Sequence, residues 1–285
     1  MSPTLVAHTG SGEVELGPAL SIFDPVHVGI DEFGQPKRVM LIERNMLIGG
    51  EPGSGKSGLL NAVVAHAALS VDCRLCLFDA KRVELGQWRK CADGFVGASI
   101  EQALTMLWRL QTMMDRRYDW LESCERRKIK PGDVFTPYVV ALDEIAYYAA
   151  TVGSKQQREE FSVLLRDLVA RGRAIGLIVV AATQRPSSDI IPTSLRDLFA
   201  WRFAGRCTTN SSSDIVLGQG WAQQGWSANQ ISPNNPGAGL LIAENGSPEL
   251  VKVAYLDDDT CAAIAGYAAV LRATVRPARR LTAVA

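Results

Sequence analysis

Short apolar runs rich in β-branched residues recur along the chain, and longer segments with helical periodicity separate most of them. Apolar runs bounded by turn residues predict buried strands. The predicted strands cover 46–49, 74–78, 138–142, 177–182, 201–205, 239–243 and 250–255. Strands that alternate with helices favour a mostly parallel sheet with helices on its faces. The pattern therefore predicts an α/β fold.

Two long helices are predicted between these strands. The first covers 100–128, where apolar residues recur every three or four positions and form one face. Ser99 and Gln102 have the sequence of a capping box at its start. The second helix covers 155–173 and precedes the strand at 177–182.

The start of the chain has a different pattern. Apolar and polar residues alternate over 25–30 and 38–43 around a turn-rich segment, which predicts a β-hairpin. Residues 208–237 are rich in Ser, Asn, Gln and Gly and predict a long excursion with short helices. We expect three regions: an N-terminal hairpin region over 1–40, a nucleotide-binding domain over 41–258, and a C-terminal helix with a basic tail over 259–285.

A glycine-rich motif follows the predicted strand 46–49. It fits G-x-x-x-x-G-K-[ST] at every fixed position, and a predicted helix follows it. In this setting backbone N–H groups surround phosphates, a lysine reaches the β- and γ-phosphates, and a hydroxyl binds Mg²⁺. Lys56 and Ser57 are the residues for the last two roles. The predicted nucleotide-binding residues are Gly50, Glu51, Pro52, Gly53, Ser54, Gly55, Lys56, Ser57 and Gly58.

Polar residues end two further predicted strands. Asp143 and Glu144 follow the run 138–142, and carboxylates at the carboxyl end of a parallel strand face the ligand-binding crevice. We expect Asp143 to hold Mg²⁺ through water and Glu144 to polarise the water that attacks the γ-phosphate. An acidic first turn of a helix would give the same pair. Gln184 follows the next strand and is predicted to sense the γ-phosphate.

Composition narrows these possibilities. The 285 residues are 47% hydrophobic, which is enough for a large α/β core in one or two domains. No apolar run approaches the roughly 18 to 20 residues of a membrane helix, and no secretory signal is visible. We therefore expect a cytoplasmic protein. Cys73 and Cys76 form a lone C-x-x-C without a second pair, so small buried apolar residues are the favoured interpretation over a zinc site.

Charge gives no simple argument for a nucleic-acid partner. Thirty basic and thirty acidic residues leave no net charge, although a ring of subunits can concentrate basic loops in a channel. Basic residues gather at the C-terminus, where they form either a solvated tail or a DNA contact. They are Arg272, Arg276, Arg279 and Arg280.

Several further segments resemble one known family. Residues 78–85 are similar to a D-P-K-x-x-E-L segment, with Ala80 in place of its proline. Residues 151–155 resemble a T-V-G-K-K loop, and 172–176 with 182–187 resemble G-R-A-x-G followed by A-T-Q-R-P-S. From about residue 25 to about residue 255, the chain resembles the FtsK/SpoIIIE family of DNA translocases.

The resemblance implies a RecA-like P-loop ATPase that uses ATP and Mg²⁺, assembles as a hexameric ring and moves double-stranded DNA. The chain is similar to the small stand-alone versions in conjugative plasmids and integrative elements of actinomycetes. This implies a role in conjugative transfer or in chromosome or plasmid movement, and it leaves room for a membrane-bound transfer partner.

Two further groups of residues follow from the resemblance. A ring ATPase needs an arginine that reaches the neighbouring subunit's γ-phosphate, and Arg173, Arg202 and Arg206 are the candidates. A surface salt bridge is the alternative for each of them. The loop 151–155 is expected to touch DNA through Lys155 and the nearby Arg158, although both also fit a solvated helix start.

Other classes are less compatible with the sequence. Motors of type VII protein secretion resemble the same family, but they usually carry several ATPase modules and a membrane anchor. A signalling GTPase would show an [NT]-K-x-D segment, and an ABC-transporter ATPase would show L-S-G-G-Q; neither is present. DNA translocation is therefore the favoured function, with the secretion motor as its alternative.

Overall fold

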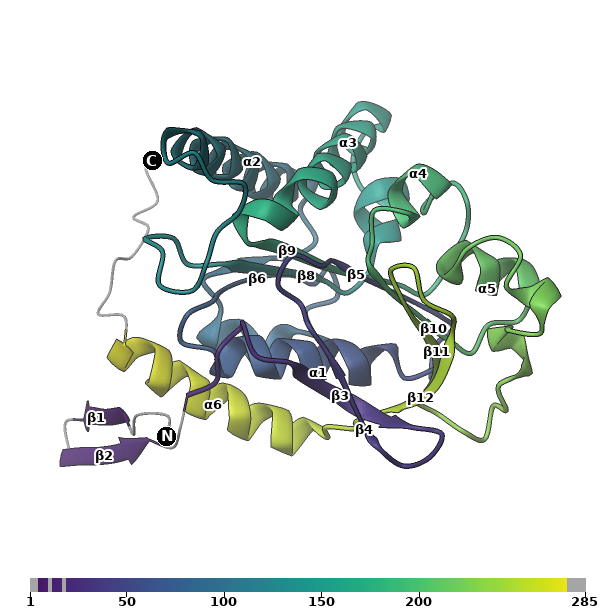
Figure 1. Ribbon diagram of the computed structural model, residues 1–285, viewed down its shortest axis with the longest axis horizontal. Coiled ribbons are helices and arrows are strands. Elements are labelled where there is room, and N and C mark those ends of the chain that lie inside the picture. The colour runs from purple at the N-terminus through teal and green to yellow at the C-terminus, as the bar shows by residue number, and fades with distance from the viewer. Residues whose placement is uncertain (1–4, 10–11, 17–18, 276–285) are drawn as a thin grey trace.

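A computed structural model describes residues 5–9, 12–16 and 19–275. Its centre is a ten-stranded sheet with the order β4-β3-β12-β11-β10-β5-β9-β8-β6-β7 (Figure 1). The strands are β3 (Val26–Asp31), β4 (Pro36–Val39), β5 (Met46–Gly49), β6 (Arg74–Phe78), β7 (Gly94–Val96), β8 (Tyr138–Leu142), β9 (Leu177–Thr183), β10 (Trp201–Gly205), β11 (Ala238–Ala243) and β12 (Glu249–Val253). The two strands β1 (Leu5–Thr9) and β2 (Gly12–Leu16) form a separate antiparallel pair.

The sheet is parallel from β10 to β7 and antiparallel from β10 to β4. Every residue of β5 and β9 is buried, as expected for parallel strands covered on both faces. The predicted hairpin is present as β3 and β4, and it extends this same sheet by pairing with β12. The predicted α/β fold with a mostly parallel sheet is confirmed.

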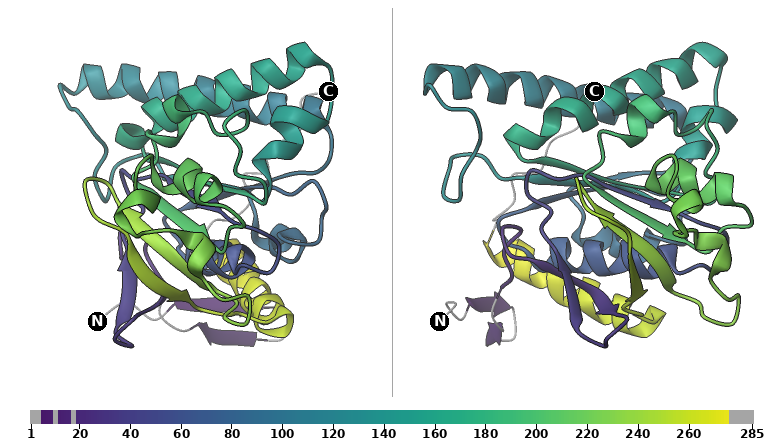
Figure 2. Two further views of the ribbon diagram at one scale, coloured as in Figure 1. Left: turned by 90° about the vertical axis from the view of Figure 1, so that its right-hand side faces the viewer. Right: turned by 45° about the vertical axis from the view of Figure 1, so that its right-hand side comes forward.

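Helices cover both faces of the sheet, as the views in Figures 1 and 2 agree. They are α1 (Lys56–Leu69), α2 (Ile100–Ser123), α3 (Lys155–Arg171), α4 (Thr193–Arg196), α5 (Asn210–Leu217) and α6 (Asp258–Val275). In β5, Leu47 packs with the core on the side of α2 and α3, whereas Met46 and Ile48 pack with the core around α1. None of the described helices is both long and apolar enough to cross a membrane.

The two long helices end earlier than their periodicity predicts. Helix α2 stops at Ser123 rather than at 128, because the chain turns at Glu125, whose φ of 53° lies in the left-handed region. Helix α3 stops at Arg171 and continues as the 3₁₀ turn Gly172–Ile175. The Ser99 side chain accepts a hydrogen bond from the Gln102 backbone N–H as expected, but the reciprocal capping box is complete at Ser154 instead.

Arg272 has a structural role rather than a place in a solvated tail. Its side chain is 7% exposed, and its guanidinium forms an ion pair of 2.5 Å with Asp93. The same group donates to the carbonyls of Ala67 and Ser70 at the end of α1. It therefore holds α6 against α1 and is removed from the candidate DNA contacts. The other candidates of that tail, Arg276, Arg279 and Arg280, lie outside the described residues.

Candidate active site

The glycine-rich loop lies between β5 and α1 at the carboxyl edge of the parallel strands (Figure 1). Two of its glycines are required by close packing as well as by positive φ. A Cβ on Gly50 (φ 145°) would lie 2.7 Å from Ser54 Oγ. A Cβ on Gly55 (φ 95°) would lie 2.3 Å from the Cα atom of Gly237. Any other residue would force the loop away from its neighbours, so the sequence motif has a direct steric reason.

Lys56 is the first residue of α1, and its side chain points back toward the glycine-rich loop. It is 7% exposed, and its Nζ donates to the carbonyl oxygen of Glu51 at 2.9 Å. Burial lowers the pKa of Lys56, while the nearby carboxylates of Glu144 and Asp143 act in the opposite direction. In the same loop, the buried Oγ of Ser54 has no partner among the described residues. A buried polar atom of this kind is suited to a ligand with hydrogen-bonding oxygen atoms, such as a phosphate.

Asp143 follows β8 and is almost fully buried. Its Oδ2 has no hydrogen-bond partner in the described part of the chain. Burial, together with the nearby carboxylates of Glu84 and Asp79, raises the pKa of Asp143 to about 7. A buried carboxylate without a partner is unfavourable unless a cation compensates it. Asp143 and the hydroxyl of Ser57 are oxygen donors of the kind that Mg²⁺ prefers, so these residues fit that ion.

Glu144 connects β8 to the neighbouring strand β9. Its Oε1 accepts from the Thr183 hydroxyl at 2.7 Å and from the Ala146 N–H at 3.1 Å, and its Oε2 accepts from the Gln184 N–H at 2.9 Å. These bonds orient the carboxylate at the edge of the sheet. The structure thus joins Glu144 and Gln184, two predicted residues from different strands. Thr183 is a site residue that the sequence prediction missed; its only signal was its position just before Gln184.

One arginine candidate, Arg206, lies at the carboxyl edge of the parallel strands, and the other two lie at the opposite edge. Arg206 follows β10 at the carboxyl edge, where its Nη2 pairs with Glu51 Oε2 of the glycine-rich loop at 2.8 Å. Arg173 lies before β9 at the opposite edge and pairs with Glu244 at 2.8 Å. Arg202 lies near the start of β10 and is 3.8 Å from Asp197. Each candidate makes an ion pair within its own chain, and the assignment of a trans-acting arginine remains a prediction.

The loop predicted to touch DNA follows a π-helical turn, Tyr147–Thr151. Lys155 is exposed, and its Nζ lies 3.7 Å from Glu159 on the next turn of α3. Arg158 instead donates to the carbonyl oxygen of Gly153 at 2.6 Å. Lys155 therefore presents its charge outward, whereas Arg158 is engaged with the loop itself.

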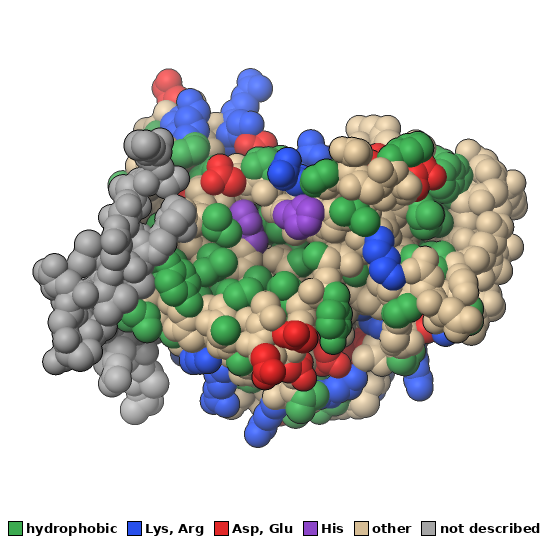
Figure 3. All heavy atoms as spheres, turned by 90° about the horizontal axis from the view of Figure 1, so that it is seen from below, with side chains coloured by type: hydrophobic (Ala, Val, Ile, Leu, Met, Phe, Trp, Pro, Cys, Tyr) green, Lys and Arg blue, Asp and Glu red, His purple; other side chains and the backbone are tan. Residues whose placement is uncertain are grey.

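No basic stripe is visible on the face of the molecule that Figure 3 shows. Basic and acidic side chains of the described residues are interspersed there. This agrees with the absence of net charge in the sequence.

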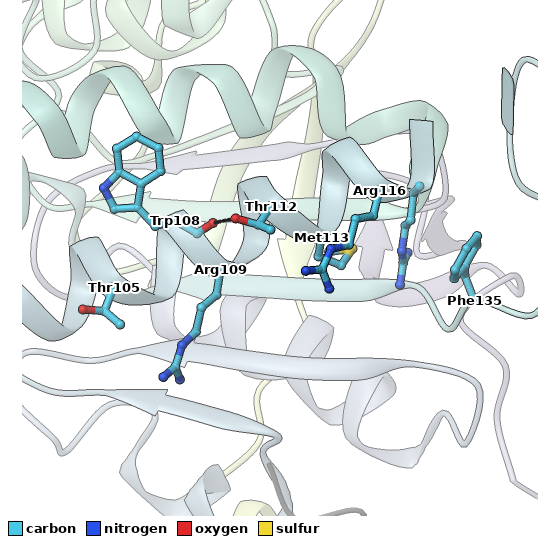
Figure 4. A pocket seen from close by; sticks show the side chains of 8 residues that line it. Thr105, Trp108, Arg109, Thr112, Met113, Arg116 and Phe135 are labelled. Atoms are coloured by element: carbon cyan, nitrogen blue, oxygen red, sulfur yellow. Dashed lines mark hydrogen bonds between the residues drawn. The ribbon is translucent and has the colours of Figure 1, made fainter. Parts of the chain in front are cut away.

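One open groove is separate from the nucleotide motifs. It has a volume of about 640 Å³ and lies along α2, lined by residues that include Trp108, Arg109, Arg116 and Phe135 (Figure 4). It contains neither the glycine-rich loop nor a carboxylate of the site, and it is therefore not the nucleotide-binding site.

The cysteines fit the predicted structural role. Cys73 and Cys76 are buried, and burial raises the pKa of Cys76 to about 12. Among the described residues, no group of three His, Cys, Asp or Glu side chains is arranged to hold a metal ion. Both cysteines are buried, as their interpretation as small buried residues predicts.

The fold and the loop with its acidic partners define a P-loop NTPase domain. The family model of FtsK/SpoIIIE matches residues 8–154, about half of the chain. The chain therefore belongs to the FtsK/SpoIIIE family.

Two similar proteins with the description DNA translocase FtsK are consistent with this assignment. DNA translocase FtsK of Treponema pallidum (strain Nichols) is 28% identical over 278 residues, which cover 85% of this chain and 34% of that protein. DNA translocase FtsK of Chlorobaculum tepidum is 30% identical over 201 residues, which cover 63% of this chain and 24% of that protein. The chain thus spans between about a quarter and a third of the length of these relatives.

Solved structures with the same fold come from two kinds of protein. The pCW3 conjugation coupling protein TcpA, solved with ATPγS, has a TM-score of 0.73 at 20% identity, covering 94% of this chain and 81% of that one. The cytoplasmic domain of the type VII secretion ATPase EccC from Thermomonospora curvata has a TM-score of 0.67 at 20% identity, covering 88% of this chain and 31% of that one. At these identities the likeness establishes the fold alone.

Proposed function

We infer that this chain is the ATP-hydrolysing motor of a double-stranded DNA translocase. The observation that carries this proposal is the set of hydrogen bonds joining Glu144 to Thr183 and Gln184 beside the glycine-rich loop. A carboxylate held in this way, in a member of the FtsK/SpoIIIE family, is suited to turn over a nucleotide rather than only to bind it.

The residues of the site divide the chemistry among them. The loop 50–58 binds the phosphates through its backbone N–H groups, and Lys56 offsets the charge of the β- and γ-phosphates. Ser57 and Asp143 hold Mg²⁺, which supplies charge stabilisation to the phosphates when it is bound. Glu144 takes the proton of the attacking water, and Gln184 responds to the presence of the γ-phosphate.

A ring of identical subunits would complete the site with an arginine from a neighbour. Arg206 is already paired with Glu51 at its own glycine-rich loop, so it is suited to a role within its own subunit. Arg173 and Arg202 lie at the other edge of the sheet and are the better candidates for action in trans. We extend the proposal to a homo-hexameric ring in the cytoplasm, recruited by a membrane-bound partner during conjugative transfer or plasmid and chromosome movement.

The conformational change that accompanies hydrolysis is transmitted to the DNA through the segment that follows Glu144. Only the π-helical turn Tyr147–Thr151 separates this residue from the loop 151–155, and π-helical turns often occur at functional sites. The ring of Tyr148 is stacked on that of Phe161 in α3, and its hydroxyl donates to the Gly97 carbonyl at 2.7 Å. A change at Glu144 is therefore transmitted to a loop that is attached firmly to the rest of the domain.

The direct test is the ATPase rate of the purified protein with and without linear double-stranded DNA. We expect DNA to stimulate hydrolysis severalfold, and the stimulation to decrease as salt rises, because phosphate contacts depend on counterion release. The alternative is the motor of a protein-secretion system, which the fold of EccC supports. An ATPase that responds to a secretion-signal peptide but not to DNA would favour that alternative.

Replacing Lys155 with Ala should weaken DNA stimulation and leave the basal ATPase rate intact. We expect the slope of log binding constant against log salt to decrease by about one, since one phosphate contact is lost. Arg158→Ala should change the conformation of the loop, because it removes the hydrogen bond from Arg158 to the Gly153 carbonyl oxygen. Lys130→Ala is the matched control, because it removes an exposed lysine at the opposite edge of the sheet. An unchanged slope in Lys155→Ala would place the DNA contact elsewhere.

A further inference from the structure

The order of the strands determines which way a bound nucleotide runs. Glu144 and Gln184 follow β8 and β9, which lie on one side of β5 and its glycine-rich loop. The γ-phosphate must lie toward these residues if Glu144 activates the attacking water, as the proposed function requires. The adenosine end then lies on the other side of the loop, toward β10, β11 and β12.

On that side, two segments pack against the start of α1. A Cβ on Gly55 would meet Gly237 as described, and a Cβ on Gly58 would lie 3.2 Å from the Ala254 carbonyl oxygen. The two segments are joined by a hydrogen bond from the Val253 N–H to the Gly237 carbonyl at 2.9 Å. They form a wall beside the first turn of α1, where the phosphate site ends.

The wall is held in place from both ends. Lys252 Nζ donates to the Asn235 side chain and to the Pro236 carbonyl, each at 2.6 Å, which fixes the loop 234–237. Beyond the wall, the Asp257 carboxylate accepts from the Thr260 N–H at 2.8 Å at the start of α6. Helix α6 then runs alongside α1 (Figure 1). The short link between β12 and α6 is therefore anchored on each side.

Tyr255 lies in this link, directly after Ala254, and is 84% exposed. Its position beside the first turn of α1 is where a nucleoside would leave the phosphate site, and its ring is open to a ligand there. We propose that Tyr255 stacks on the base of the bound nucleotide, with residues 234–237 bordering the base. This inference rests on the proposed function, because it uses the orientation that Glu144 imposes on ATP.

Stacking predicts that the site accepts different bases. Every base has a π-face, so an aromatic platform contributes affinity without selecting one base. Tyr255 should therefore support ATP and GTP alike, and selectivity between them would have to come from other groups. Since stacking on an aromatic side chain is worth about 1–3 kcal/mol per base, its loss corresponds to at least about a fivefold change in affinity.

The experiment compares ligands with and without a base. We expect Tyr255→Ala to weaken binding of Mg-ATPγS and of Mg-GTPγS about tenfold and to leave binding of Mg-tripolyphosphate unchanged. Tyr255→Phe keeps the ring and should bind all three like the unaltered protein. Phe33→Ala is the matched control, because Phe33 is an equally exposed aromatic residue at the turn between β3 and β4, away from the loop. Isothermal titration calorimetry measures all of these affinities.

The possible failures are distinguishable. Unchanged ATPγS affinity in Tyr255→Ala overturns the inference, and a loss of ring assembly in that variant would assign Tyr255 to a contact between subunits. Equal losses for ATPγS and tripolyphosphate also overturn it, because the phosphate site would then have been disturbed. If the folded, unaltered protein binds neither ligand, the proposed function fails first and the inference fails with it.

Discussion

Replacing Glu144 with Gln should preserve ATP binding and reduce hydrolysis by about 10²- to 10⁴-fold, the range that general base catalysis contributes. The carboxamide keeps the shape of the side chain but cannot accept a proton from water. It also has one acceptor oxygen in place of two, so it cannot keep the bonds from both Thr183 and Gln184. The measurement is a single-turnover assay of ATP cleavage together with the affinity for ATPγS.

Thr183 provides the control for this experiment. Thr183→Ser keeps the hydroxyl that donates to Glu144 and should retain most of the activity, whereas Thr183→Val removes the donor and should give an intermediate loss. This gradation separates the orientation of the carboxylate from its basicity. Hydrolysis at the unaltered rate in Glu144→Gln would show that another group acts as the base.

Much of the fold was predictable because its signal is local. The parallel strands are fully buried, so they appear in the sequence as continuous apolar runs, and the run over 138–142 became β8 with the same bounds. Strand β7 was missed because it has only three residues and begins at Gly94. The strands β1 and β2 were also missed. Their segments have only five residues each and pair with each other outside the main sheet.

The sequence could predict those site residues whose positions follow from their neighbours in the same short segment. Lys56 follows its loop directly, and Asp143 with Glu144 ends a strand. Contacts between distant segments have no such signal. Arg272 belonged by its sequence to a basic tail, yet it is buried against Asp93, which lies 179 positions earlier. Its charge is compatible with the interior only because a carboxylate and several carbonyl groups surround it.

The arginine candidates illustrate the same limit in another way. Arg173 lies in a segment that fits a family motif, whereas Arg202 and Arg206 lie on the next predicted strand. Sequence alone does not say at which edge of the sheet each side chain emerges. The pairing of β10 with β5 places Arg202 beside Leu47 near the starts of the strands. Arg206 emerges four positions later at the glycine-rich loop. This difference determines which nucleotide each side chain can reach, and it depends on strand register.

Replacing Lys56 with Ala should abolish ATP binding at millimolar concentrations without unfolding the protein. The ammonium is buried in a site that also holds Asp143 and Glu144, so it offsets negative charge before any nucleotide arrives. Without it, the phosphates of ATP would meet these carboxylates with no buried cation from the loop. The fold itself does not need this charge, because burial makes an ammonium costly and alanine is favourable in a helix.

Thermal unfolding separates these two effects. Mg-ATP should raise the Tm of the unaltered protein by several degrees, because a ligand at about 100 times its Kd stabilises the folded state by about 2.7 kcal/mol. Lys56→Ala should have an unchanged or higher Tm without nucleotide and show no increase when Mg-ATP is added. Lys130→Ala, which removes an exposed lysine, should respond like the unaltered protein. An undiminished shift in Lys56→Ala would mean that the loop backbone alone holds the phosphates, and the role assigned to Lys56 would be wrong.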